Sequence, residues 1–188
     1  MSPDFSPLIY KLSWDSSRDR PSLPADISTE IPADVKKAVR GLLRFGGYKP
    51  SGRGRPASES LAKAAEEGRF PTIHPVVDFF NIVSLESGFP ISVLDADKLD
   101  GETEFRLGLQ GEVYVFNPSG QELKVEGLPV LCDRVGPTGS PVKDAQRTKV
   151  DDATSSFFVV VWGTSELQER LDSVAARIDA WTSECEIA

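Results

Sequence analysis

The chain is poor in the residues from which several common kinds of active site are built. Its 188 residues include one histidine, His74, and two cysteines, Cys132 and Cys185, with no CxxC pair. These counts exclude a multi-histidine metal site, a zinc ribbon, a thioredoxin-type redox pair and a disulfide framework. We therefore expect no metal and no cofactor, and a Ser-His or Cys-His mechanism would depend on His74 alone.

Long apolar runs are also lacking. No segment approaches the roughly 20 apolar residues that cross a bilayer, and the first ten residues lack the basic and apolar stretches of a signal peptide. We expect a cytoplasmic protein with no membrane partner. With 39% hydrophobic and 27% charged residues, 188 residues suit a single globular domain.

Positive charge is scarce except in one segment. The formal net charge is -8, which argues against a protein that coats DNA. The segment from Lys36 to Arg69, however, contains nine basic residues and three glutamates. Its net charge is +6, which leaves -14 for the remainder of the chain. Such a segment is suited to bind a few phosphates locally, although a solvated helix face has the same composition.

A glycine-rich loop lies inside this basic segment. Residues 46–56 read GGYKPSGRGRP, and they lead into a predicted helix. Backbone N–H groups and guanidinium groups in such a loop can converge on a phosphate or a carboxylate. The anion-binding candidates here are Lys49, Arg53 and Arg55. The alternative is an arginine-rich turn anchored to neighbouring carboxylates, and the loop is neither a P-loop nor a Rossmann fingerprint.

Periodicity predicts helices at both ends of the chain and strands between them. Residues 1–32 are expected to form a short strand over 5–14 and an irregular arm, followed by a helix from Ala33 to the glycines at 46 and 47. Further helices are predicted over 56–68 and 75–85, the latter closed by Gly88. Strands are predicted over 91–94, 104–107, 113–117, 121–125, 130–133 and 157–162, the last covered on both faces.

A C-terminal amphipathic helix is predicted over 164–184. Thr164 and Ser165 open it, and Gln168 follows Ser165 by three residues as in a capping box. Its apolar stripe consists of Leu167, Leu171, Val174, Ile178 and Trp181. The stripe favours packing on its own domain over packing on a partner helix. Together these elements predict one α+β domain over 1–188, with a mixed β-sheet core and flanking helices.

Residues 70–101 carry an ordered series of short motifs. They are VVD at 76–78, Asn81, VSLE at 83–86, Gly88, Pro90 and DADKLDG at 95–101. This series resembles the B3/B4 domain of the bacterial phenylalanyl-tRNA synthetase beta subunit. The resemblance continues through 128–130 and 148–150 to the strand at Val161, and covers about half of the chain. The segments 52–59, 116–120 and 143–149 resemble a free-standing B3/B4 protein, and no synthetase motif accompanies them.

The resemblance implies a pocket that admits the aminoacyl end of a mischarged tRNA and hydrolyses its ester, so tRNA and an amino acid are the expected partners. Asn81 falls on the family's pocket asparagine and is the first candidate for holding the substrate, unless it is only a polar position on a helix. Ser92 falls where the synthetase domain has a histidine. The glutamate that recognises a tyrosine hydroxyl there falls near Val160 or Val161, so an apolar or different amino acid is expected here.

Further candidates follow from the same resemblance. Asp144 is a candidate for positioning water or the α-amino group, and Lys143 or Arg147 for facing the terminal adenosine's phosphate. A surface ion-pair cluster is the alternative for these three. The remaining substrate-binding candidates are Ser84, Glu86, His74 and Val161. Glu86 is more simply a helix-end carboxylate, and His74 a helix cap or pocket-wall residue. Cys132 is given no role.

Three functional hypotheses remain open on this basis. The first is an aminoacyl-tRNA deacylase that is not a complete tRNA ligase. The second is a non-catalytic module that binds tRNA or an amino acid, which the absent pocket histidine and glutamate support. The third is a hydrolase or sensor for an amino-acid-like molecule whose carboxylate is held by Arg53 and Arg55.

Overall fold

The computed structural model describes residues 1–14 and 20–183. Its α-helices are α1 (Ala33–Arg44), α2 (Ala57–Glu66), α3 (Pro75–Ser87) and α4 (Gln168–Ser183). Its strands are β1 (Leu8–Ser13), β2 (Ile91–Asp95), β3 (Glu104–Leu107), β4 (Val113–Val115), β5 (Glu122–Lys124), β6 (Pro129–Asp133), β7 (Gly136–Gly139) and β8 (Ser156–Val161). Short 3-10 turns are η1 (Gly52–Gly54), η2 (Ala96–Lys98), η3 (Gln146–Thr148) and η4 (Ser165–Leu167). The α+β class is confirmed.

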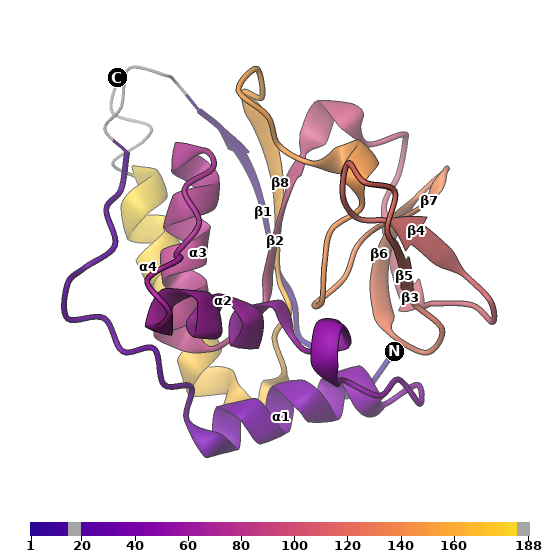
Figure 1. Cartoon of the computed structure of the whole chain (residues 1–188), viewed down its shortest axis with the longest axis horizontal. Helices are drawn as coiled ribbons and strands as arrows, with labels where there is room; N and C mark the ends of the chain where they lie inside the picture. The colour runs from indigo at the N-terminus through magenta and orange to yellow at the C-terminus, as the bar shows by residue number, and fades with distance from the viewer. Residues whose placement is uncertain (15–19, 184–188) are drawn as a thin grey trace.

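A three-stranded antiparallel sheet separates two halves of the molecule. Its order is β1-β8-β2, so the continuous apolar strand β8 is central, as its composition predicts. Helices α2, α3 and α4 lie on one side of this sheet and the shorter strands β3 to β7 on the other (Figure 1). Side chains of β8 alternate between the two sides. Phe157, Val159 and Val161 join the core of the helices, whereas Phe158, Val160 and Trp162 pack with Leu131 and Phe105.

The apolar stripe of α4 packs on the rest of this chain. Leu171 and Ile178 are completely buried, and the Trp181 ring stacks on Phe79 of α3 with 3.9 Å between centroids. The preference for packing within the domain is thus confirmed. Asp179 of α4 lies beside Tyr10 of β1, and burial together with this carboxylate raises the pKa of Tyr10 to about 12. Residue 184 and Cys185 lie outside the described residues.

The predicted capping box at the start of α4 is wrong. Residues 165–167 form the 3-10 turn η4, and neither Thr164 nor Ser165 caps the helix through its side chain. Gln168, the intended partner, instead donates from its side-chain amide to Asp172 at 2.8 Å. The backbone N–H of Ser165 donates to the carbonyl of Asp4. It therefore does not need the side chain of Gln168 as an acceptor, which a capping box would supply.

The strands on the other side do not form one mixed sheet. They pair as an antiparallel sheet of order β3-β6-β7 and a separate hairpin of β4 and β5. Strand β7 was not predicted because its sequence, Gly-Pro-Thr-Gly, has the composition of a turn. It pairs with β6 through a register shift at Leu131 and Cys132, and the following loop returns toward β2.

Two glycines bring the end of α1 against the turn before β6. A Cβ on Gly46 would lie 2.3 Å from the carbonyl oxygen of Gly127, and one on Gly127 would lie 2.0 Å from that of Gly46. Gly127 also has a φ of +69°, which few other residues adopt. Backbone therefore packs directly on backbone where the helical half meets the small sheets.

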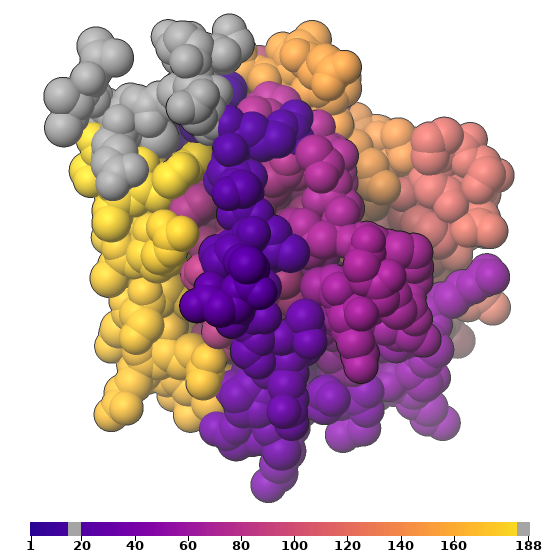
Figure 2. Space-filling view, turned by 60° about the vertical axis from the view of Figure 1, so that its left-hand side comes forward, coloured from indigo at the N-terminus to yellow at the C-terminus, as the bar shows by residue number. Residues whose placement is uncertain are grey.

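The described part of the N-terminal arm, residues 20–32, contains no helix or strand and crosses the outside of the helical half between α2 and α4 (Figure 2). Arg20 forms an ion pair with the buried Asp78 at the start of α3. Within residues 1–14 and 20–183, no helix is long and apolar enough to cross a membrane.

Candidate functional site

The loop after β7 is held in one conformation by the hydroxyl of Ser140. The backbone N–H groups of Val142 and Lys143 both donate to Ser140 Oγ, each at 3.3 Å. The hydroxyl of the buried Tyr114 bonds with Ser140 Oγ at 2.8 Å and also donates to the Lys143 carbonyl. This turn presents the next residue, Asp144, toward the central sheet.

Asp144 and Ser92 face the same point in space. A Cβ on Gly139 would lie 2.8 Å from Asp144 Oδ1 and 3.4 Å from Ser92 Oγ. Only glycine at this position leaves the two oxygens accessible to each other. Ser92 is 1% exposed, and Oδ1 of Asp144 is buried without a hydrogen-bond partner at ordinary distance. A buried carboxylate oxygen in this condition marks a place where a ligand or water would be bound.

The Ser92 side chain is oriented by Trp162, which follows the last residue of β8. The indole Nε1 donates to Ser92 Oγ at 2.8 Å, so the serine oxygen is an acceptor in this contact. The hydroxyl proton of Ser92 points toward the Ser140 carbonyl at 3.5 Å, the limit of a hydrogen bond. Ser92 therefore keeps a donor that a closer acceptor can take.

Burial dominates the protonation of Asp144. It raises the pKa of this carboxyl to about 7, although the Ser92 hydroxyl, the Lys149 ammonium and nearby backbone N–H groups act in the opposite direction. A carboxyl group with a pKa near neutrality can both accept and return a proton at physiological pH. It can equally hold an ammonium group while ionised.

Two lysines flank Phe116 at the end of β4. The Lys149 ammonium donates to the Phe116 carbonyl oxygen at 2.6 Å, and the Lys143 ammonium lies 4.6 Å from the centre of the Phe116 ring. Burial lowers the pKa of both lysines. The charges of Lys149 and Arg53 lower the pKa of Lys143 further, whereas the Asp144 carboxylate opposes the lowering at Lys149. Lys149 was not among the predicted site residues, because nothing in its local sequence distinguishes it from a surface lysine.

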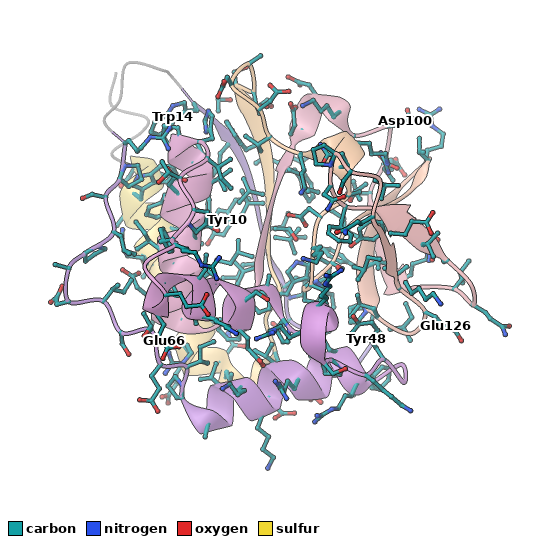
Figure 3. All side chains as sticks on the ribbon, viewed as in Figure 1. Tyr10, Trp14, Tyr48, Glu66, Asp100 and Glu126 are labelled. Atoms are coloured by element: carbon teal, nitrogen blue, oxygen red, sulfur yellow. The ribbon has the colours of Figure 1, made fainter. Side chains whose placement is uncertain are left out.

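Arg53 reaches this group from the glycine-rich loop. Residues 52–54 form η1, which Tyr48 secures by donating its hydroxyl to the Gly54 carbonyl at 3.1 Å. Tyr48 lies beside η1 on the side that faces the small sheets (Figure 3). Arg55 does not share this position, since its Nε donates to the Gly52 carbonyl at 2.8 Å within the same turn. Lys49 is exposed.

Other predicted site residues have structural partners. His74 caps α3, because its Nδ1 accepts from the Val76 N–H at 3.2 Å, and Ser84 donates to the Phe89 carbonyl at 2.7 Å. Glu86 is exposed near the end of α3 and pairs with Arg177 of α4 at 3.5 Å. The cap interpretation of His74 and the helix-end interpretation of Glu86 agree with these contacts.

Arg147 and Val161 are also engaged within the fold. Both terminal nitrogens of the Arg147 guanidinium bond to the buried carboxylate of Asp133, at 2.8 and 2.7 Å. This contact helps to hold the pKa of Asp133 down at about 2. Val161 is completely buried in β8 opposite Leu8 and Ile91. Arg147 thus connects η3 to β6 through a structural ion pair.

Asn81 is half-buried on α3 and its side chain makes no hydrogen bond among the described residues. No hydrogen bond or ion pair in that part of the chain joins it to Ser92 or Asp144, so its role stays a prediction. Four surface hollows of about 250 to 690 Å³ lie elsewhere, at the start of α4, between α3 and α4, between α1 and α2, and beside η2. None of the four is lined by Asn81, Ser92 or Asp144.

The residues of the DADKLDG motif form hydrogen bonds with the segment that carries Lys149. Asp95 accepts from Thr154 at 2.7 Å and from the Asp97 N–H at 3.0 Å. Lys98 donates to the carbonyl of Lys149 at 2.8 Å and pairs with Asp151. The motif therefore fixes the backbone from which the Lys149 ammonium extends toward Phe116.

Within residues 1–14 and 20–183, no group of three His, Cys, Asp or Glu side chains is arranged to hold a metal ion. Burial raises the pKa of the Cys132 thiol to about 11, so this thiol is protonated near neutral pH.

A family model described as the B3/4 domain matches residues 49–178, which include Ser92, Asp144 and the cations Arg53, Lys143 and Lys149. The chain belongs to the B3/4 domain family. The matched segment begins at Lys49, just before η1, and ends within α4. The expected resemblance is confirmed by this match.

Curated relatives of this B3/4 domain chain are phenylalanine–tRNA ligase beta subunits. That of Legionella pneumophila (strain Lens) is 27% identical over 100 residues, which are 53% of this chain and 13% of the relative. That of Bartonella henselae is 28% identical over 101 residues, 52% of this chain and 12% of the relative. The chain thus spans about an eighth of the length of these relatives.

A solved structure also resembles part of the B3/4 domain chain. It is an N-terminal fragment of the phenylalanyl-tRNA synthetase beta-subunit from Pyrococcus horikoshii, with 14% identity and a TM-score of 0.44. The likeness covers 55% of this chain and 40% of that one.

Proposed function

We propose that this B3/4 domain chain binds the aminoacyl end of a tRNA and hydrolyses the ester of a mischarged aminoacyl-tRNA as a single cytoplasmic domain. The observation that carries the proposal is the facing pair of Ser92 and Asp144 above Gly139, with an unpartnered carboxylate oxygen. Its place within the matched B3/4 segment, and relatives named as phenylalanine–tRNA ligase beta subunits, support tRNA as the partner.

The pair is suited to ester hydrolysis without a metal. In the proposed step, the Asp144 carboxylate accepts a proton from a water whose oxygen attacks the ester carbonyl carbon. The ester C–O bond then breaks, and the ribose hydroxyl leaves with a proton returned from Asp144. Ser92 donates its hydroxyl proton to the substrate or to the water, since Trp162 already occupies one lone pair of its oxygen.

The test is deacylation of a panel of labelled aminoacyl-tRNAs, matched and mismatched, by the wild-type chain and by Asp144→Asn. We expect one or a few mismatched esters to be cleaved, and the variant to lose about 100-fold or more in rate, the usual contribution of a positioned base. Asp26→Asn, which changes an exposed carboxylate of the N-terminal arm, is the matched control and should cleave normally. Asn81→Ala, tested beside them, measures the contribution of the half-buried asparagine.

A flat panel with retained binding of tRNA would contradict the hydrolase and favour a binding module. Two observations favour the binding module. Ser92 stands where the family has a pocket histidine, and valines stand at 160 and 161. If Asp144→Asn cleaves at the wild-type rate, the chain is still a hydrolase but Asp144 is not its base.

A further inference from the structure

Three cations lie near one another with no carboxylate at ion-pair distance, although the Asp144 carboxylate acts on Lys149 from farther away. Lys149 and Lys143 contact the carbonyl and the ring of Phe116, and Arg53 is close enough to lower the pKa of Lys143. Among the described residues, none of the three makes an ion pair. Both lysines are partly buried, so water screens their mutual repulsion less than it would at the surface.

The missing ion pairs do not reflect a shortage of carboxylates. The chain has 29 acidic residues for 21 basic ones, so carboxylates are in excess. Three guanidinium groups elsewhere have a carboxylate partner: Arg40 with Glu59 at 2.6 Å, Arg106 with Glu112 at 2.7 Å and Arg147 with Asp133 at 2.7 Å. Arg55 and Arg170 donate to backbone carbonyls instead. Cations left unpaired in such a protein indicate a place for an anion that comes from outside.

We propose that Lys143, Lys149 and Arg53 form an anion-binding site that holds a carboxylate or phosphate group beside Ser92 and Asp144. Lys149 uses one N–H on the Phe116 carbonyl and keeps two donors for the ligand. Lys98 fixes the backbone of Lys149, and the Phe116 ring holds the Lys143 ammonium in place. The site can read either a phosphate of the tRNA end or an acidic side chain on the amino acid.

The experiment measures binding of small anions by titration calorimetry at constant ionic strength, with chloride as the balancing ion. Inorganic phosphate and AMP represent the tRNA source. Glutamate α-methyl ester represents an acidic aminoacyl group, and glutamine methyl ester, which lacks only the side-chain charge, is its neutral counterpart. No tRNA and no ester cleavage are needed, so failure here is separate from failure of the proposed hydrolase.

We expect saturable binding of at least one anion, weakened about tenfold or more by Lys149→Met and by Lys143→Met, since a charge-assisted hydrogen bond lost here corresponds to that factor. Lys124→Met, which alters an exposed lysine of β5, should bind as the wild type does. Phosphate and AMP binding assign the site to the nucleic acid, and preference for the glutamate ester over the glutamine ester assigns it to the side chain. The proposal is overturned if no probe saturates, or if both lysine variants that fold bind like Lys124→Met.

Discussion

At the scale of single residues, the most consequential group is the carboxyl of Asp144. A pKa near 7 in the folded chain, against about 4 in an unfolded one, means that the folded state binds more protons between these values. Folding stability contributed by this group is therefore present at acid pH and is lost as the pH rises toward 7. Function at neutral pH thus comes at the expense of stability at this position.

Replacing Asp144 by Asn should remove this pH dependence. At pH 7.5 we expect the variant to be more stable than the wild type by about 1 kcal/mol or more, because it removes a carboxylate whose burial outweighs the favourable effect of its neighbours. At pH 5 the difference should be smaller, and it should disappear below about pH 4, where the carboxyl is protonated in both the folded and the unfolded state. Urea unfolding at both pH values measures the difference, with Asp26→Asn as the exposed control. A difference that is the same at pH 5 and 7.5 would show that the carboxyl does not titrate in this range.

The sequence provided a set of candidate site residues and could not rank them. Asp144, Ser92, Lys143 and Arg53 were candidates from motif position or local charge, and the structure brings these four toward one place. Arg147 carries the same charge in the same segment, yet it is engaged by Asp133. Which lysine or arginine keeps its charge available depends on contacts between segments far apart in the chain, and local sequence does not contain that information.

At the scale of elements, helices were predicted more accurately than strands. The stop signals at Gly47, Gly68 and Gly88 all have positive φ, and α1, α2 and α3 end just before them. Strand β7 was missed because its pairing with β6 outweighs the turn preference of Gly-Pro-Thr-Gly. This strand ends with Gly139, so the residue that makes room for Asp144 and Ser92 belongs to the element that sequence periodicity did not find.

The glycine contact between α1 and the turn before β6 gives a test at this scale. Gly127→Ala places a methyl group 2.0 Å from the Gly46 carbonyl oxygen at a φ of +69°, so the two segments must separate. Gly120→Ala has a similar φ of +75° but open space around the methyl group. We expect about 1 kcal/mol of destabilisation for Gly120→Ala, from conformational strain alone, and at least twice as much for Gly127→Ala.

Urea unfolding of both variants and the wild type measures this comparison. Equal losses in the two variants would mean that the α1 end and the turn are free to move apart without cost. In that case Gly46 and Gly127 would not fix the relation between the helical half and the small sheets.

At the scale of the whole molecule, charge is distributed to favour local rather than general binding of nucleic acid. The segment from Lys36 to Arg69 carries +6 and the remainder -14, and part of the positive charge is consumed internally, as by Glu59 on Arg40. Few cations are left for phosphates. We therefore expect tRNA binding with a shallow dependence on salt, about 0.7 in the slope of log K against log salt for each phosphate contact in single-stranded RNA.

Arg53→Ala should weaken tRNA binding and reduce the magnitude of this slope by about one contact. Lys124→Ala removes the same charge from β5 and should leave the slope unchanged. Filter binding over a series of salt concentrations measures both variants. Identical slopes for Arg53→Ala and the wild type would exclude η1 from the tRNA interface.

The hydrogen bond from Trp162 to Ser92 has a further consequence. Of the three tryptophans, Trp14 and Trp181 stack on each other with 5.6 Å between ring centroids, whereas Trp162 is completely buried and bonds directly to the site. The indole that bonds to Ser92 thus belongs to a different apolar cluster from the stacked pair. The chain therefore carries optical labels in two places: the fluorescence of Trp162 is expected to respond to events at Ser92, and that of the stacked pair to movements of the terminal helix.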